Sequence, residues 1–157
     1  MIEVGSNLPQ ASLSQITSKG MQNPSTQDLF GSKKVVLFAV PGAFTPTCSE
    51  AHLPGYVALA DKIKEKGVDS IICVSVNDAF VMKAWGDALN AEHITMLADG
   101  NGSFTKSIGL DMETESFGGL RSQRYSMLVD DGVVTVLNVE EGGKFEVSDA
   151  ETMLAAL

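Results

Sequence analysis

VVLFAVPGAFTPTCSEAHLPG (residues 35–55) joins a short apolar run to a segment crowded with proline, glycine and threonine. VVLFAV (35–40) is a continuous apolar run of strand length, as expected for a strand that is buried on both faces. The pair Pro41-Gly42 ends this strand. Cys48 follows where the next element, a helix, is expected to begin. A buried strand that leads through a turn into a helix indicates an α/β fold.

The helix is predicted from Ser49 onward, because apolar residues recur there at three- and four-residue spacings. Lys66-Gly67 closes it. Pro54-Gly55 lies inside this stretch, and a proline removes a backbone hydrogen bond from a helix interior. We therefore expect a kink or a break near residues 52–55.

The rest of the chain alternates between predicted strands and helices. The further elements are a strand at 70–76, a helix at about 79–90, a strand at 94–99, a short helix near 103–108, a hairpin at 125–139, and a helix at 147–157 capped by Ser148 or Asp149 with Glu151 in a capping box. The polar stretch 14–28 and the glycine-rich stretch 109–123 are predicted to be surface loops. The sequence therefore predicts one α/β domain over residues 1–157, with a mixed central sheet and helices on both faces.

Composition and charge exclude several classes of protein. The chain has 157 residues and a net charge of −9, which argues against nucleic acid or an anionic membrane as a main partner. No apolar run is long enough for a transmembrane helix, and the N-terminus lacks the pattern of a signal peptide. Two cysteines, Cys48 and Cys73, do not make a disulfide scaffold, so a reducing cytoplasm is the expected compartment. No metal or other cofactor is expected, because the two histidines, His52 and His93, show no metal-ligand spacing.

Cys48 is the residue with the most reactive chemistry in the chain. The thiolate, not the thiol, is the nucleophile, and the first turn of a helix favours negative charge through its free N–H groups and its dipole. A cation brought in by the fold would favour the thiolate further. The candidates are His52, which shares a face with Cys48 in a regular helix, and the arginines Arg121 and Arg124.

Thr45 and two prolines complete this pattern. The Thr45 hydroxyl can donate to the thiolate or to a bound oxygen, and it can accept in turn. Pro41 and Pro46 stiffen the loop and remove N–H donors, which helps to hold water away from the sulfur. The segment therefore predicts a positioned, shielded thiolate that is suited to nucleophilic attack.

Each of these roles has an alternative. Cys48 alone could be a small packed residue, Thr45 a simple N-cap, and Arg124 the partner of a surface carboxylate. A cysteine hydrolase would pair Cys48 with a histidine as the base, but neither histidine lies in a recognisable hydrolase motif. A redox sensor or redox-regulated binding protein would use the same first chemical step as an enzyme, and turnover separates the two.

Pro41-x-x-x-Thr45-x-x-Cys48 matches the P-x-x-x-T/S-x-x-C motif of the peroxiredoxins. The longer strings VPGAFTPTCSEAHLPGY, CVSVNDAFVMKAW and RYSMLVDDGVV resemble the Prx5 subfamily, which includes plant type II and many bacterial members. The resemblance extends over about residues 3–157. It implies a thioredoxin-like fold and an enzyme that reduces hydrogen peroxide, organic hydroperoxides and often peroxynitrite.

The resemblance also implies a role for each residue of the motif. Cys48 would attack the terminal peroxide oxygen and become a sulfenic acid. Thr45 and Arg124 would hold the peroxide oxygens and stabilise the developing charge, and Pro41 would shield the intermediate. Arg124 is preferred over Arg121 because it directly precedes the YSMLV strand, as the family's arginine does.

Two further residues are expected near the substrate. His52 matches a histidine that is usual in the subfamily. Phe117 is expected to form part of an apolar pocket wall.

Regeneration of the thiol raises the question of Cys73. It lies in the apolar run IICVSV, so a buried structural role competes with a role as resolving cysteine. The resolving cysteine that many animal members carry near the C-terminus is absent from GGKFEVSDAETMLAAL. The resemblance to plant type II members therefore implies a one-cysteine cycle with glutathione, glutaredoxin or thioredoxin as reductant, and Cys48–Cys73 resolution is the alternative. A homodimer is also expected from the subfamily.

Overall fold

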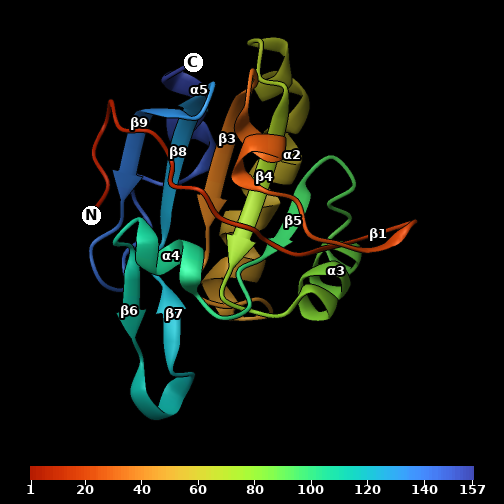
Figure 1. The fold of residues 1–157 in the computed structure, drawn as a ribbon, viewed down its shortest axis with the longest axis vertical. Helices are drawn as coiled ribbons and strands as arrows, with labels where there is room; N and C mark the ends of the chain where they lie inside the picture. The colour runs from red at the N-terminus through yellow and green to blue at the C-terminus, as the bar shows by residue number, and fades with distance from the viewer.

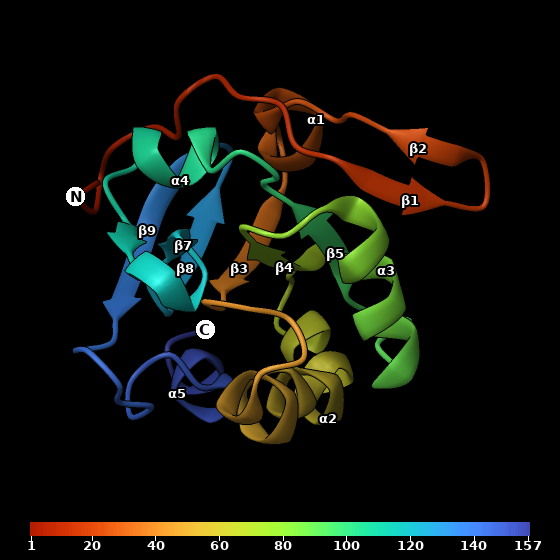
Figure 2. The same ribbon diagram turned by 90° about the horizontal axis from the view of Figure 1, so that it is seen from below.

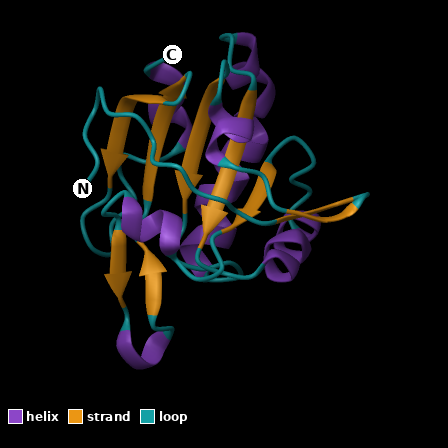
Figure 3. Cartoon of the chain, viewed as in Figure 1, coloured by secondary structure: helices purple, strands orange, loops and turns teal.

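The computed structural model describes all residues from 1 to 157. Its centre is a five-stranded sheet with the strand order β5-β4-β3-β8-β9 (Figures 1 and 3). The strands are β3 (Lys34–Ala39), β4 (Ser70–Ser75), β5 (Thr95–Ala98), β8 (Tyr125–Asp130) and β9 (Val133–Val139). β3, β4 and β5 run parallel, whereas β8 is antiparallel to β3 and β9 is antiparallel to β8. The predicted mixed sheet is therefore confirmed.

Helices cover both faces of this sheet, as predicted (Figure 2). One face carries α2 (Leu53–Glu65), α3 (Ala79–Ala88) and α5 (Ala150–Ala155), and the other carries α1 (Thr26–Phe30) and α4 (Ser103–Ser107). In β3, Val36 and Phe38 belong to the first apolar cluster, and Val35 and Leu37 belong to the second. Successive side chains of a strand point to opposite faces, so a strand covered on both sides is apolar throughout. None of the helices combines the length and the apolar character that crossing a membrane requires.

The two stretches predicted as loops contain short strands instead. Residues 14–28 hold the hairpin of β1 (Gln15–Thr17) and β2 (Gly20–Gln22), and residues 109–123 hold β6 (Asp111–Glu113), the 3-10 turn η2 (Glu115–Phe117) and β7 (Leu120–Ser122). Each strand has only three residues, too few for an alternating pattern to be read. Backbone hydrogen bonds between Ser14 and Ala98 dock the first hairpin on β5, and no local pattern reveals such a distant contact.

The helix after Cys48 is interrupted close to the predicted place. A single π-helical turn, η1 (Cys48–His52), precedes α2, and the N–H of Leu53 donates to the carbonyl of Cys48. Pro54 is the second residue of α2, but the helical stretch enters α2 from η1 without a break, so the missing N–H of Pro54 removes a hydrogen bond at this junction. The irregular turn therefore lies at residues 48–52, just ahead of the expected 52–55.

The C-terminal helix is shorter than the predicted 147–157. It begins at Ala150, and the Asp149 side chain caps it by accepting the N–H of Thr152. Because the cap is Asp149, the residue at the third helical position is Thr152 rather than Glu151, so the predicted capping box does not form. Ser148 stays outside the helix.

Candidate active site

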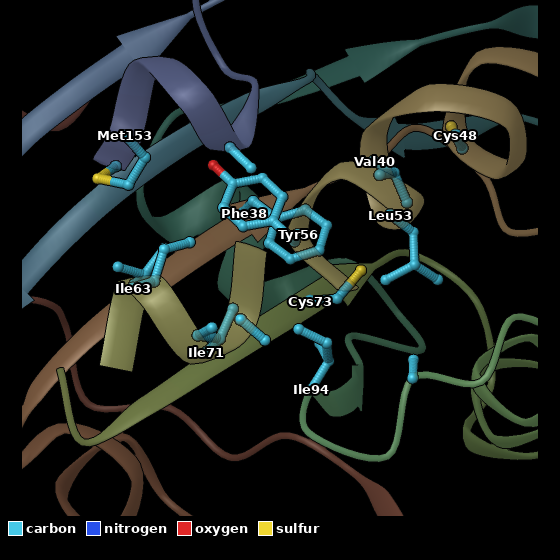
Figure 4. Close-up of a cluster of buried hydrophobic side chains, with 14 of the residues drawn as sticks. Phe38, Val40, Cys48, Leu53, Tyr56, Ile63, Ile71, Cys73, Ile94 and Met153 are labelled. Atoms are coloured by element: carbon cyan, nitrogen blue, oxygen red, sulfur yellow. The ribbon is translucent and has the colours of Figure 1, made fainter. Parts of the chain in front are cut away.

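Cys48 is the first residue of the π-helical turn, which follows the 41–45 loop and two helical residues, Pro46 and Thr47. Its side chain is fully buried and belongs to the apolar cluster on the α2 face of the sheet (Figure 4). The π-helical turn continues directly into α2, and the whole helical stretch extends from Pro46 to Glu65, so Cys48 lies in the first turn at its N-terminal end. The N–H groups and the dipole at such an end favour negative charge on the sulfur.

Arg124 lies between β7 and β8, at the end of the sheet where β3 finishes. Its Nη2 donates to Cys48 Sγ at 3.1 Å, and its Nη1 lies 2.8 Å from His52 Nδ1. The guanidinium also faces the ring of Phe145, with its central carbon 5.8 Å from the ring centroid. A positively charged donor at hydrogen-bond distance favours the thiolate over the thiol. The structure thus brings the arginine preferred from the sequence to the sulfur.

His52 is buried among three aromatic rings, those of Phe38, Tyr56 and Phe145. Its Nε2 lies 3.0 Å from the carbonyl oxygen of Ser148. Since a carbonyl only accepts, Nε2 carries the ring proton, and the bare Nδ1 accepts from Arg124. Burial, aided by the positive charge of Arg124, lowers the pKa of His52 from 6.5 to about 3. His52 is therefore a neutral acceptor for Arg124 and not the cation beside Cys48, a role for which the sequence made it one of three candidates.

Thr45 and Pro41 lie in the loop that leads to Cys48. Thr45 Oγ1 donates to the carbonyl of Gly42 at 2.6 Å rather than to the sulfur. Because its proton is committed in this way, the oxygen keeps its lone pairs for a donor on a ligand. Pro41 and Arg124 line a cavity of about 330 Å³, through which a small molecule can reach the guanidinium.

Cys73 lies in β4, paired with Phe38 of β3, and is buried as completely as Cys48. Burial raises the pKa of Cys73 well above its usual value, and the nearby Cys48 adds to the rise. In the view of Figure 4, the side chains of Val40 and Leu53 lie between the two sulfur atoms. Both thiols are free. Cys73 is therefore held as a neutral thiol within the core.

Phe117 and Arg121 are not brought to Cys48. Phe117 lies in the turn at the tip of the β6–β7 hairpin (Figure 1), where its side chain is 75 % exposed and lines no part of the cavity beside Pro41. Within one chain, Phe117 therefore does not form the expected pocket wall, because the β6–β7 hairpin, which the sequence did not predict, places it away from the central sheet. Arg121 donates to the carbonyls of Gly118 and Val76 at 3.0 and 3.1 Å, and so braces this hairpin.

Two residues that no sequence motif marks as functional, Glu140 and Ser148, support His52. The Ser148 carbonyl accepts from His52 and from the hydroxyl of Tyr56, the latter at 2.9 Å. The Glu140 carboxylate accepts from the N–H and the hydroxyl of Ser148. Glu140 stands in the string EEGG, which is typical of an exposed turn, and Ser148 had been considered only as a helix cap. No local signal distinguishes either residue.

Comparison with known proteins shows what this chain is similar to. The family model described as Redoxin matches residues 3–154. The chain is 50 % identical to "Peroxiredoxin-2E, chloroplastic" of Arabidopsis thaliana over 162 residues, which cover 99 % of this chain and 69 % of that relative. It is 48 % identical to Peroxiredoxin-2B of the same plant, with 99 % of this chain and 98 % of the relative covered.

Solved structures agree in fold. Reduced Prx3 in complex with H2O2 from Vibrio vulnificus is 68 % identical, with a TM-score of 0.98 and 99 % of each chain covered. Peroxiredoxin 5 from Alvinella pompejana is 35 % identical, with a TM-score of 0.88 and with 99 % of this chain and 97 % of that chain covered. The thioredoxin-like fold implied by the sequence resemblance is therefore confirmed.

Proposed function

Because this chain belongs to the peroxiredoxins, within the redoxin family, it is a thiol-dependent peroxidase, and we propose that Cys48 is its peroxidatic cysteine. The thiolate attacks the terminal oxygen of ROOH, so that an S–O bond forms while the O–O bond breaks. The sulfur becomes a sulfenic acid, and the departing RO⁻ takes a proton from solvent and leaves as ROH. The observation that carries this proposal is the 3.1 Å hydrogen bond from Arg124 Nη2 to the buried sulfur.

Arg124 and Thr45 divide the work of holding the peroxide. Negative charge builds on the departing oxygen as the O–O bond lengthens, and the guanidinium beside the sulfur stabilises that charge. Thr45 Oγ1 donates its own hydrogen bond to the Gly42 carbonyl, so it can accept a hydrogen bond from the O–H of the hydroperoxide and thereby aim the terminal oxygen at the sulfur. Pro41 offers no N–H and helps to keep water from the sulfenic acid.

Hydrogen peroxide and organic hydroperoxides are the proposed substrates, with peroxynitrite as a further oxidant. The 68 % identical Prx3 of Vibrio vulnificus, solved in complex with H2O2, supports the first of these. The cavity of about 330 Å³ beside Arg124 supports the second, because it leaves room for an organic group. His52 contributes to substrate binding through the guanidinium that it holds.

The proposed catalytic cycle uses one cysteine. Cys73, buried and held as a neutral thiol, is a poor nucleophile for a sulfenic acid. Glutathione, alone or with glutaredoxin, or thioredoxin attacks the sulfenic sulfur instead, releases water and leaves a mixed disulfide that a second thiol reduces. Intact mass after one equivalent of peroxide, with no reductant, tests this cycle. We expect the gain of one oxygen, whereas the loss of two hydrogens that disappears in Cys73→Ser would contradict it.

The proposal includes an assembly and a compartment. Phe44 and Phe80 are 58 % and 69 % exposed, and contact between two copies of the chain would remove such aromatic surface from water. We therefore propose a homodimer, and sedimentation equilibrium measures its mass. Two free cysteines suit a reducing cytoplasm, and cell fractionation tests that location.

The second-order rate constant for reaction with H2O2 tests the central proposal. We expect the wild-type protein to react orders of magnitude faster than free cysteine and Cys48→Ser to lose this reaction. A wild-type rate no faster than that of free cysteine would overturn the assignment of Cys48. Multiple turnovers with glutathione and glutaredoxin, or with thioredoxin, distinguish an enzyme from a sensor, which reacts once and stays oxidised.

A further inference from the structure

Glu140 directly follows β9 and is a buried carboxylate, with only 8 % of its surface exposed. Neither of the two ion pairs in the structure includes it. Its carboxylate accepts the N–H groups of Glu146 and Val147 at 2.9 Å and that of Ser148 at 2.8 Å, and it also accepts the Ser148 hydroxyl at 2.7 Å. Three successive N–H groups converge on one side chain, which fixes the conformation of residues 146–148.

The charge of Glu140 is stabilised by these donors rather than by a cation. Burial by itself raises the pKa of Glu140, but the hydrogen bonds from Glu146, Ser148 and Val147 outweigh burial and hold the pKa below its usual value. The residue is therefore an ionised acceptor at neutral pH, with each donor drawn from the same short segment.

The Ser148 carbonyl is where this segment meets the active site. It accepts from His52 Nε2 at 3.0 Å and from the Tyr56 hydroxyl at 2.9 Å. An acceptor at Nε2 selects the tautomer in which Nδ1 has a free lone pair, and only that tautomer can accept the 2.8 Å hydrogen bond from Arg124. The other tautomer would point an N–H at a guanidinium N–H and displace it from its place beside Cys48.

Glu140 is also tied to the main chain of Arg124. The N–H of Glu140 donates to the carbonyl of Arg124 at 3.0 Å, next to the pairing of β8 and β9. Its backbone and its side chain thus reach the same arginine by two routes, one direct and one through Ser148 and His52. A rigid closed ring of contacts of this kind limits the positions that the guanidinium can adopt.

We propose that Glu140 is a positioning residue for the peroxidase reaction, because its carboxylate holds the Ser148 carbonyl, which selects the His52 tautomer that aims Arg124 at Cys48. The inference rests on the proposed roles of Cys48 and Arg124. The proposed roles of Cys48 and Arg124 and the role of Glu140 can fail separately. A wild-type protein that reacts slowly with H2O2 refutes the first. A wild-type protein that reacts fast, with a Glu140 variant that reacts equally fast, refutes only the role of Glu140.

Glu140→Gln is the variant that tests the proposal, because it keeps the size of the side chain but removes the charge and turns one oxygen into a donor that faces donors. We expect the rate constant with H2O2 to fall roughly 10- to 100-fold, by analogy with the loss of an outer partner that orients a metal-bound histidine. The rate at which Cys48 is alkylated at neutral pH should fall as well. A purely structural role would lower the melting temperature and leave the rate of the folded protein unchanged, which would overturn the proposal.

Glu151→Gln is the matched control. It removes one negative charge from exposed surface on α5, three residues beyond Ser148, and its rate constant should equal that of the wild type. If Glu140→Gln does not fold, ¹⁵N spectra of histidine-labelled wild-type protein still decide. We expect a single Nε2–H tautomer of His52 at neutral pH. An Nδ1–H tautomer, or rapid exchange between the two tautomers, would refute the proposed link from Glu140 through Ser148 and His52 to Arg124.

Discussion

Cys48 and Cys73 are both completely buried, both free thiols, and both members of one apolar cluster. They differ in what lies next to the sulfur. Cys48 begins a helical turn and accepts a 3.1 Å hydrogen bond from Arg124. Cys73 lies in the middle of β4, and its burial raises its pKa well above the usual value. Burial alone therefore does not determine whether a cysteine is inert, because a single charged donor changes which protonation state the site favours.

The difference has its origin in the backbone. A strand in the centre of a sheet commits its N–H groups to neighbouring strands, so it offers the sulfur no free donors. A turn at the end of a sheet lies where loops from distant parts of the chain meet, and a cation can approach it there. The thiol is thus a packed core group at Cys73 and a candidate nucleophile at Cys48.

Replacing each cysteine in turn should give the largest difference in the rate constant with H2O2. Cys48→Ser should lower the rate constant with H2O2 by at least about 1,000-fold, since the nucleophile is lost. Cys73→Ala should leave the first oxidation step within about twofold of the wild type, because that thiol stays neutral and buried. Stopped-flow kinetics measures both, and an equal loss in the two variants would erase the distinction between the cysteines.

Removing the charged donor should make the surroundings of Cys48 more like those of Cys73. Arg124→Ala should slow the reaction with H2O2 by about 100- to 1,000-fold, the usual cost of losing one donor to a developing negative charge. Arg121→Ala is the matched control, since that guanidinium bonds the carbonyls of Gly118 and Val76, and it should change the rate only a few-fold. Comparable losses in the two variants would argue against a direct role of Arg124.

The hydroxyl of Thr45 is a second polar group near Cys48 that Cys73 lacks, and its removal should lower the rate constant with H2O2 less than the removal of Arg124. Thr45→Val keeps the shape of the side chain but removes the acceptor for a hydroperoxide proton, so the rate constant should fall about 10- to 100-fold. Thr45→Ser retains the hydroxyl and should stay within a few-fold of the wild type. Steady-state assays at several peroxide concentrations measure both variants. A Thr45→Val enzyme as fast as Thr45→Ser would show that the hydroxyl only braces the loop at Gly42.

Through its titration, His52 should affect the stability of the fold at low pH rather than the rate of the reaction at neutral pH. Its pKa is about 3 in the folded protein and 6.5 when unperturbed, so the unfolded chain binds more protons between these values. The free energy of unfolding should therefore be fully retained above pH 6.5 and fall by up to about 1.4 kcal/mol for each pH unit below it. Urea unfolding at pH 7.5 and pH 5 measures this fall. His52→Gln, which does not titrate, should show a flatter profile, and a profile as steep as that of the wild type would assign the fall to other groups.

The sequence by itself determined the central strand, the turn at Pro41-Gly42 and the placement of Cys48 at the start of a helix. Local apolar periodicity and the backbone limits of proline and glycine act within a few residues, and they leave a direct trace in the order of residues. The short strands β6 and β7 leave no such trace, because three residues per strand carry no readable period. The position of Phe117, between these two strands, therefore could not be read from the sequence.

Only the tertiary structure decided which groups surround the sulfur. Arg124 and Cys48 are 76 positions apart, and Ser148 and His52 are 96 apart, so no local pattern links them. The low pKa of His52 follows from burial, and its tautomer follows from the Ser148 carbonyl that it contacts. The local sequence around His52 reveals neither of these surroundings. Local sequence chemistry indicates Cys48 as the candidate nucleophile, whereas folding brings distant donors and acceptors to it, because hydrogen bonds depend on distance in space and not on distance along the chain.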